Sequence, residues 1–160
     1  MPLPAFGNYN IGSIVDIRLK SPPITLDHTS MNCAWMENTD TTDPDYSAYF
    51  QNAYDPATDS FVFKGAEMVI AADMDVDGCK IELIGSVIKF QEDTSAIADH
   101  PILTISGGGS IIMTADPAIP ADKPSIEGAG NVDVVDIRIN SGGTLDVQSG
   151  KLKNFILDSK

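Results

Sequence analysis

The sequence predicts an all-β protein whose strands enclose a narrow apolar core. Within residues 66–157, apolar residues recur at every other position, which places them on one side of a pleated strand. Glycines separate these alternating stretches and supply backbone angles that other residues resist. The region shows no 3.6-residue spacing typical of an amphipathic helix. The chain has 160 residues, enough for one domain or one domain with a small appendage.

The beginning of the chain differs in character from the rest. We expect residues 1–60 to form a capping or docking segment and residues 61–160 to form the β-rich domain. A strand is predicted at Ile14–Lys20. It ends at Pro22 and Pro23, because proline cannot donate a hydrogen bond to a strand ladder.

Aromatic residues cluster in the second half of this N-terminal segment. Asp43 and Pro44 form a helix-start signal, which predicts a short helix over residues 45–53. Trp35, Tyr46 and Tyr54 flank or lie in this helix. We expect them to cap an open apolar end of the domain, and an exposed platform for a glycan is the alternative.

A series of short strands follows from Phe61. Their predicted ranges are 61–63, 66–71, 74–76, 80–84, 86–90, 102–106, 110–114, 132–139, 144–147 and 151–157. Two longer loops, at 91–101 and 116–125, interrupt the series. The second loop contains three prolines, which cannot occupy central ladder positions.

Two units show the pattern most clearly. Leu103–Met113 and Ile137–Val147 each consist of a strand, a glycine-rich corner and a second strand, and Gly85–Phe90 consists of a glycine corner followed by a strand. With these units, residues 61–158 resemble right-handed parallel β-helix proteins of the surface and fibre type. The resemblance implies a short, irregular right-handed β-solenoid with an N-terminal cap. An antiparallel β-sandwich or jelly roll is the alternative that the strand count also allows.

The composition of the chain limits the classes of partner that we expect. The formal net charge is −13, from 23 acidic and 10 basic residues, which disfavours nucleic acid and anionic membranes. No stretch approaches the ~18 apolar residues of a membrane span, so no membrane insertion is expected. Met1–Phe6 lacks the start of a secretion signal. We therefore expect either a virion component or an excerpt from a longer secreted chain.

The chain has two cysteines, Cys33 and Cys79. Their spacing is not that of a zinc site. A disulfide in an oxidising compartment and two buried thiols both remain open at this point.

Asp73, Asp75 and Asp77, followed by Gly78, resemble the start of a calcium-binding loop. Position twelve of such a loop would be Ile84 instead of a bidentate glutamate. We therefore favour a strand whose aspartates face solvent, with calcium as the one candidate cofactor.

No catalytic motif is present. The single outward-facing pair of basic and acidic residues that we expect in the strand region is Arg138 with Asp136. We therefore expect a non-enzymatic structural protein that assembles with copies of itself or with neighbouring subunits in a virion, as a fibre, spike base or capsid decoration. A surface-layer or sheath module at the cell surface is one alternative, and a carbohydrate-binding or polysaccharide-lyase-like β-helix module is another.

Overall fold

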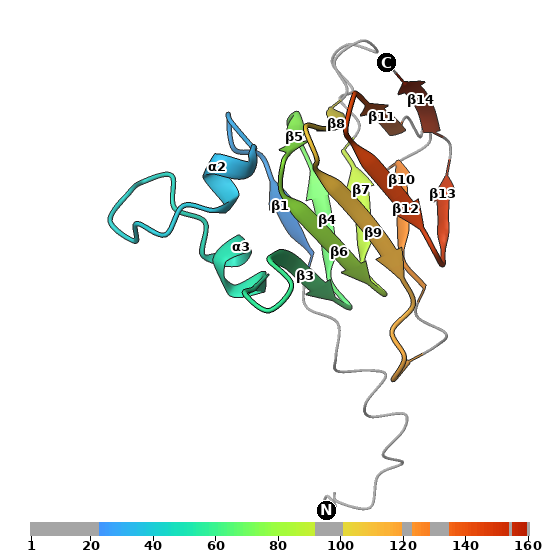
Figure 1. Cartoon of the computed structure of the whole chain (residues 1–160), viewed down its shortest axis with the longest axis horizontal. Helices are drawn as coiled ribbons and strands as arrows, with labels where there is room; N and C mark the ends of the chain where they lie inside the picture. Colours follow the sequence, from blue (N-terminus) through green and yellow to red (C-terminus); the bar gives the residue numbers. More distant parts are fainter. Residues whose placement is uncertain (1–22, 92–100, 120–122, 129–134, 154, 160) are drawn as a thin grey trace, which may run out of the picture.

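The computed structural model describes residues 23–91, 101–119, 123–128, 135–153 and 155–159 (Figure 1). Short strands dominate this part of the chain. In chain order the elements are β1 (Ile24–Leu26), α2 (Cys33–Met36), α3 (Ala48–Ala53), β2 (Tyr54–Asp55), β3 (Ser60–Lys64), β4 (Glu67–Ile70), β5 (Met74–Asp77), β6 (Lys80–Ile84), β7 (Val87–Phe90), β8 (Ile102–Ser106), β9 (Ser110–Thr114), β10 (Ser125–Gly128), β11 (Val135–Ile139), β12 (Thr144–Val147), β13 (Lys151–Lys153) and β14 (Phe155–Ser159).

The strands form three sheets, in the orders β1-β4-β7-β10-β13, β14-β11-β8-β5 and β12-β9-β6-β3-β2. Neighbouring strands run parallel, except that β2 pairs antiparallel with β3. From β3 onward, successive strands join the three sheets in a fixed rotation. In Figure 1, β3, β6, β9 and β12 accordingly lie side by side. The predicted all-β class is confirmed with parallel sheets, and the antiparallel sandwich is wrong for the described strands.

The rotation depends on tight corners between strands. A side chain at Gly109 would overlap the carbonyl oxygen of Val76 on the neighbouring strand, so that only glycine fits there. At the equivalent corner of the next rung, a side chain at Gly143 would overlap the carbonyl oxygen of Ile105. The glycine pattern in the sequence therefore reflects close backbone approach between successive rungs.

Alternation along each strand separates core from surface. In β5, Met74 and Val76 are buried, while Asp75 and Asp77 are exposed. The inward residues of successive strands stack in register, as Ile81 does on Ile111. Burial of each such side chain stabilises the fold by about 1.5–3 kcal/mol.

The two helices lie beside the first strands of the stack (Figure 1). Phe50 of α3 is completely buried and packs among first-rung core residues, including Phe61 and Phe63. Asn32 caps α2 by accepting a hydrogen bond from the Trp35 backbone N–H at 2.9 Å. A disulfide joins Cys33 of α2 to Cys79, at the corner between β5 and β6.

Several predicted element bounds need correction. The predicted helix over 45–53 begins only at Ala48, because Tyr46 closes a turn on Asp43 and Ser47 is the N-cap. Helix α2 was not predicted. Strand β10 begins at the last residue of the predicted 116–125 loop and continues beyond it. The predicted strand at Ile14–Lys20 lies outside the described residues, as do residues 132–134 of another strand. In the described part of the chain, no helix is long and apolar enough to cross a membrane.

Candidate functional site

The two ends of the strand stack differ in what covers them. One end carries β1, β2 and β3 together with both helices. At the other end the sheets finish on β12, β13 and β14, which we call the open end. Among the described residues each of these three strands has a single strand neighbour. Within the described ranges no strand pairs with their outer backbone N–H and C=O groups, and groups of this kind can pair with a further strand.

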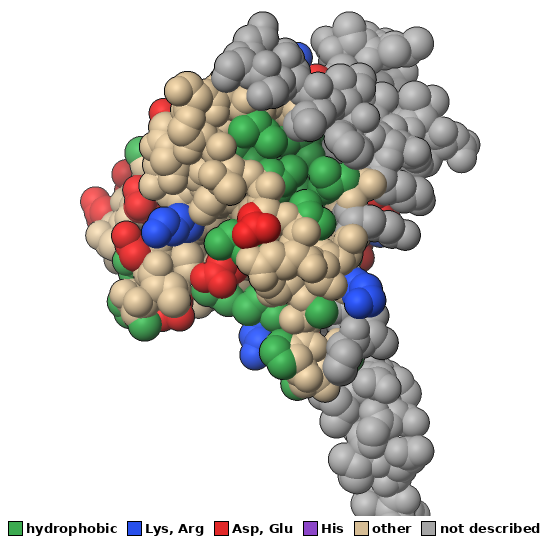
Figure 2. Space-filling model, turned by 45° about the vertical axis from the view of Figure 1, so that its right-hand side comes forward, with side chains coloured by type: hydrophobic (Ala, Val, Ile, Leu, Met, Phe, Trp, Pro, Cys, Tyr) green, Lys and Arg blue, Asp and Glu red, His purple; other side chains and the backbone are tan. Residues whose placement is uncertain are grey.

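Apolar side chains accompany these unpaired edges. Leu145 and Leu152 are partly buried and pack against the core, and Val147 is 38% exposed. Figure 2, in which the right-hand side of Figure 1 comes forward, shows hydrophobic side chains gathered near the middle of the visible face. The open end thus combines the backbone groups and the apolar side chains that strand addition requires.

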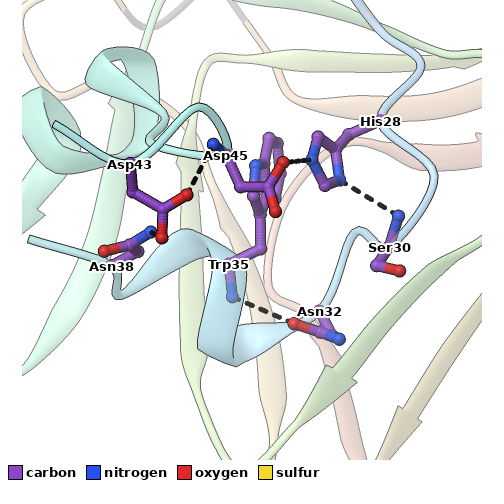
Figure 3. Close-up of polar contacts among 7 residues, drawn as sticks. All are labelled: His28, Ser30, Asn32, Trp35, Asn38, Asp43 and Asp45. Atoms are coloured by element: carbon purple, nitrogen blue, oxygen red, sulfur yellow. Dashed lines mark hydrogen bonds and ion pairs between the residues drawn. The ribbon is translucent and has the colours of Figure 1, made fainter. Parts of the chain in front are cut away.

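The opposite end is closed by an aromatic cluster. Trp35 stacks on His28, with ring centroids 4.9 Å apart, and contacts Phe50 edge-on at 5.2 Å. The His28 ring is itself fixed, because Nδ1 accepts the Ser30 backbone N–H and Nε2 lies 3.1 Å from the Asp45 carboxylate (Figure 3). The indole is therefore occupied by packing within the protein, as a cap residue would be.

The other two predicted contact residues, Tyr46 and Tyr54, lie outside the stack of Trp35 on His28. Tyr46 is half-buried, and its backbone N–H closes the turn on Asp43. Tyr54 begins β2 and is 38% exposed. Tyr54 therefore lies at the edge of the packed rings of the cap, where its ring contacts Phe61 at a centroid distance of 5.6 Å and stays partly exposed.

A shallow groove of about 350 Å³ lies between the β1–α2 connection and the outer face of the β5-β8-β11 sheet. Asp75, Thr104 and Arg138 line it from three adjacent strands at the same register. Asp73 also lines it, and its carboxylate accepts the Ile102 backbone N–H at 2.9 Å. Arg138 pairs through two nitrogens with both carboxylate oxygens of Asp136, each at 3.2 Å. Acidic, hydroxyl and guanidinium groups thus share one groove.

Asp73 directly precedes β5, and Asp75 and Asp77 lie on the outer side of that strand. More than a third of each of these three residues is exposed to solvent. Partial burial, and then the neighbouring charge of Asp77, raise the pKa of Asp75. Among the described residues, no three His, Cys, Asp or Glu side chains lie close enough together to hold a metal ion. Calcium at Asp73, Asp75 and Asp77 therefore stays a prediction without geometric support, and calcium titration with a melting-temperature readout tests it.

Sequence reasoning left two of these features undetermined. The Cys33–Cys79 pair joins residues 46 positions apart, and no sequence signal distinguishes this pairing from two separate thiols. The second feature is the groove, whose lining comes from separate strands and becomes contiguous only through the strand register.

No protein-family model, curated protein or solved structure matches the chain.

Proposed function

We propose that this protein is a non-enzymatic structural module that assembles with copies of itself or with neighbouring subunits through its open end. Its fold is, in this proposal, a short, irregular right-handed β-solenoid. The fixed rotation of strands through three parallel sheets supports this fold. The rotation is also the pattern that a right-handed crossover between parallel strands favours.

The asymmetry between the two ends is the observation that carries the proposal. The first-rung end is covered by Phe50 and its neighbouring rings and is fixed by the disulfide. The open end has no such cover among the described residues. A strand edge left in this state pairs readily with another chain, and a defined partner turns this liability into a specific contact.

The open end could both bind a partner strand and determine its register. Backbone hydrogen bonds to a partner strand would contribute about 0.5–1.5 kcal/mol each. Burial of Val147, together with the exposed parts of Leu145 and Leu152, would add an apolar contribution. Because side chains alternate along each strand, a one-residue slip of a partner strand would place its opposite set of side chains over these apolar groups.

The setting we propose is a virion, with a surface layer or sheath of a cell envelope as the alternative. The disulfide supports an extracellular location in either case, because disulfides persist on virion and cell surfaces and are rare in the cytosol. The acidic surface supports a protein partner over nucleic acid.

Light scattering coupled to size-exclusion chromatography tests the proposal across a range of protein concentrations. We expect the wild-type protein to form oligomers as concentration rises, and a Leu145→Lys/Val147→Lys variant to remain monomeric. Thr25→Lys, a lysine substitution at the exposed position of β1 at the opposite end, should assemble like the wild type. A wild-type protein that stays monomeric at the highest concentration would refute assembly between copies, and equal assembly of both variants would refute the open end as the interface.

A further inference from the structure

Among the residues whose burial the structure describes, which leaves out 135, 151 and 153–160, Tyr54 is one of two exposed large apolar side chains, the other being Val147 at the open end. The Tyr54 ring is fixed at two points. Its centroid lies 5.6 Å from that of Phe61, and its hydroxyl donates to the Asp59 carboxylate at 2.7 Å. An exposed aromatic ring held in a single orientation is a preorganised contact surface.

The residue that holds the hydroxyl has an unusual backbone. Asp59 has a φ of 51° and is the one non-glycine residue with positive φ in the described ranges. Aspartate tolerates this left-handed region better than most residues, although at some conformational cost. The turn between β2 and β3 therefore keeps a strained residue whose carboxylate orients Tyr54.

Tyr54 borders a hollow of about 210 Å³ together with Glu37, Thr39 and Gln51. The Gln51 amide is itself positioned, because its nitrogen donates to the Met36 backbone carbonyl at 2.7 Å. Glu37 ends α2 and is exposed. A phenol ring, a carboxylate, an amide and a hydroxyl thus line one space, which is too small for a drug-sized ligand, whose pockets measure about 300–1,000 Å³.

These groups match the two surfaces of a sugar ring. The C–H face of a pyranose packs on an aromatic ring, and its hydroxyl groups donate to carboxylate and amide oxygens. The charge around the hollow also indicates which class of sugar it would accept. Negative charge at Asp59, Glu37 and Asp55 surrounds the Tyr54 hydroxyl, and this field disfavours an anionic sugar.

We propose that the hollow bordered by Tyr54, Glu37, Thr39 and Gln51 binds a single neutral sugar residue. Tyr54 provides the stacking surface and Glu37 accepts hydrogen bonds from sugar hydroxyl groups. The hollow lies at the helix-covered end of the molecule, away from the open end. Sugar binding and assembly are therefore independent, and a structural module with this hollow would attach to a glycan by the end opposite to its interface.

Saturation-transfer NMR with methyl glycosides of glucose, galactose, mannose and N-acetylglucosamine tests the proposal, and glucuronic acid and sialic acid serve as the anionic arm. We expect at least one neutral glycoside to bind, and both acids to bind at least about tenfold more weakly. Tyr54→Ala should abolish binding, whereas Tyr54→Phe, which keeps the ring, should retain most of it. Glu37→Gln should weaken binding about tenfold, as loss of a charged hydrogen-bond acceptor does.

Val147→Ala is the matched control, because it truncates the other exposed apolar side chain at the far end, and it should bind like the wild type. Glu37→Gln alters an exposed side chain and decides the question if Tyr54→Ala fails to fold. Absence of binding by all four glycosides overturns the proposal. Equal binding of the anionic sugars, or full binding by folded Tyr54→Ala or by Glu37→Gln, also overturns it.

Discussion

The Cys33–Cys79 disulfide should contribute a large share of the stability of the fold. It joins α2 to the β5–β6 corner and closes a loop of 46 residues. A cross-link of this length lowers the entropy of the unfolded chain by about 14 cal/mol/K, which corresponds to about 4 kcal/mol near room temperature. A typical domain is stable by only about 5–15 kcal/mol, so that loss of this bond should be plainly measurable.

Urea unfolding, followed by circular dichroism and by Trp35 fluorescence, gives the measurement. With a slope of about 2 kcal/mol per molar urea, reduction should lower the midpoint by about 2 M. Because Trp35 lies in α2, its fluorescence should change with the cap when the bond is broken. The Cys33→Ala/Cys79→Ala variant is the control, since its midpoint should already be low and should not respond to reductant.

Two results would refute the reasoning. One is a midpoint that reductant leaves unchanged in the wild-type protein. The other is titration of two thiols in the unreduced, unfolded protein, which would mean that the cysteines are not joined.

Three further predictions concern the corners and the cap. Gly109→Ala should lower the free energy of unfolding by about 3 kcal/mol in urea titrations, because its methyl group meets the Val76 carbonyl. Gly65→Ala, whose methyl group enters open space at a positive φ, should lower it by about 1 kcal/mol. Equal losses in the two variants would contradict the close-approach argument. Burial raises the pKa of Tyr49 to about 12. Because the unfolded chain then loses this proton at lower pH than the folded protein, stability measured by thermal melts should fall as pH rises from about 10 to about 12. Tyr49→Phe should lack that part of the loss. The Tyr49 hydroxyl is buried and has no hydrogen-bond partner among the described residues, so Tyr49→Phe should also gain about 1 kcal/mol at neutral pH, and a loss of stability would contradict this reading.

Strand positions in the second half of the chain were largely predictable. The predicted ranges 80–84, 102–106, 110–114 and 144–147 coincide with β6, β8, β9 and β12. Each of these strands carries apolar residues at alternate positions and borders a glycine at one end, Gly85 and Gly107 after β6 and β8 and Gly109 and Gly143 before β9 and β12, so that local sequence largely determines their bounds. The same local signal does not say whether neighbouring strands run parallel or antiparallel, because the side-chain alternation is identical in both.

The errors arise where long-range contacts override local signals. Strand β10 follows Pro124 and has Ile126 as its one apolar residue, yet it pairs in register with β7. Helix α2 has only four residues, and its Asn32 cap and disulfide hold it in place. The pairing of β10 with β7 and the Cys33–Cys79 bond are not visible in the local sequence, whereas Asn32 is a local N-cap signal too weak to predict so short a helix.

The candidate sites were predictable as residue types and not as groupings. Trp35, Tyr46 and Tyr54 appeared as one aromatic cluster in the sequence. The structure packs Trp35 between His28 and Phe50 and leaves Tyr54 exposed. This difference in exposure depends on how the helices meet the first rung, which sequence spacing does not specify.

Hydrogen exchange at low and high protein concentration tests the central claim of assembly through the open end most directly. We predict that amide exchange in Thr144–Val147 and Lys151–Lys153 slows as concentration rises, because a partner strand pairs with these edges. Exchange in the strand Lys80–Ile84, which already pairs with a neighbouring strand on each side, should not change with concentration and serves as the internal reference. Open-end exchange rates that are the same at all concentrations, in a sample that forms oligomers, would contradict the account.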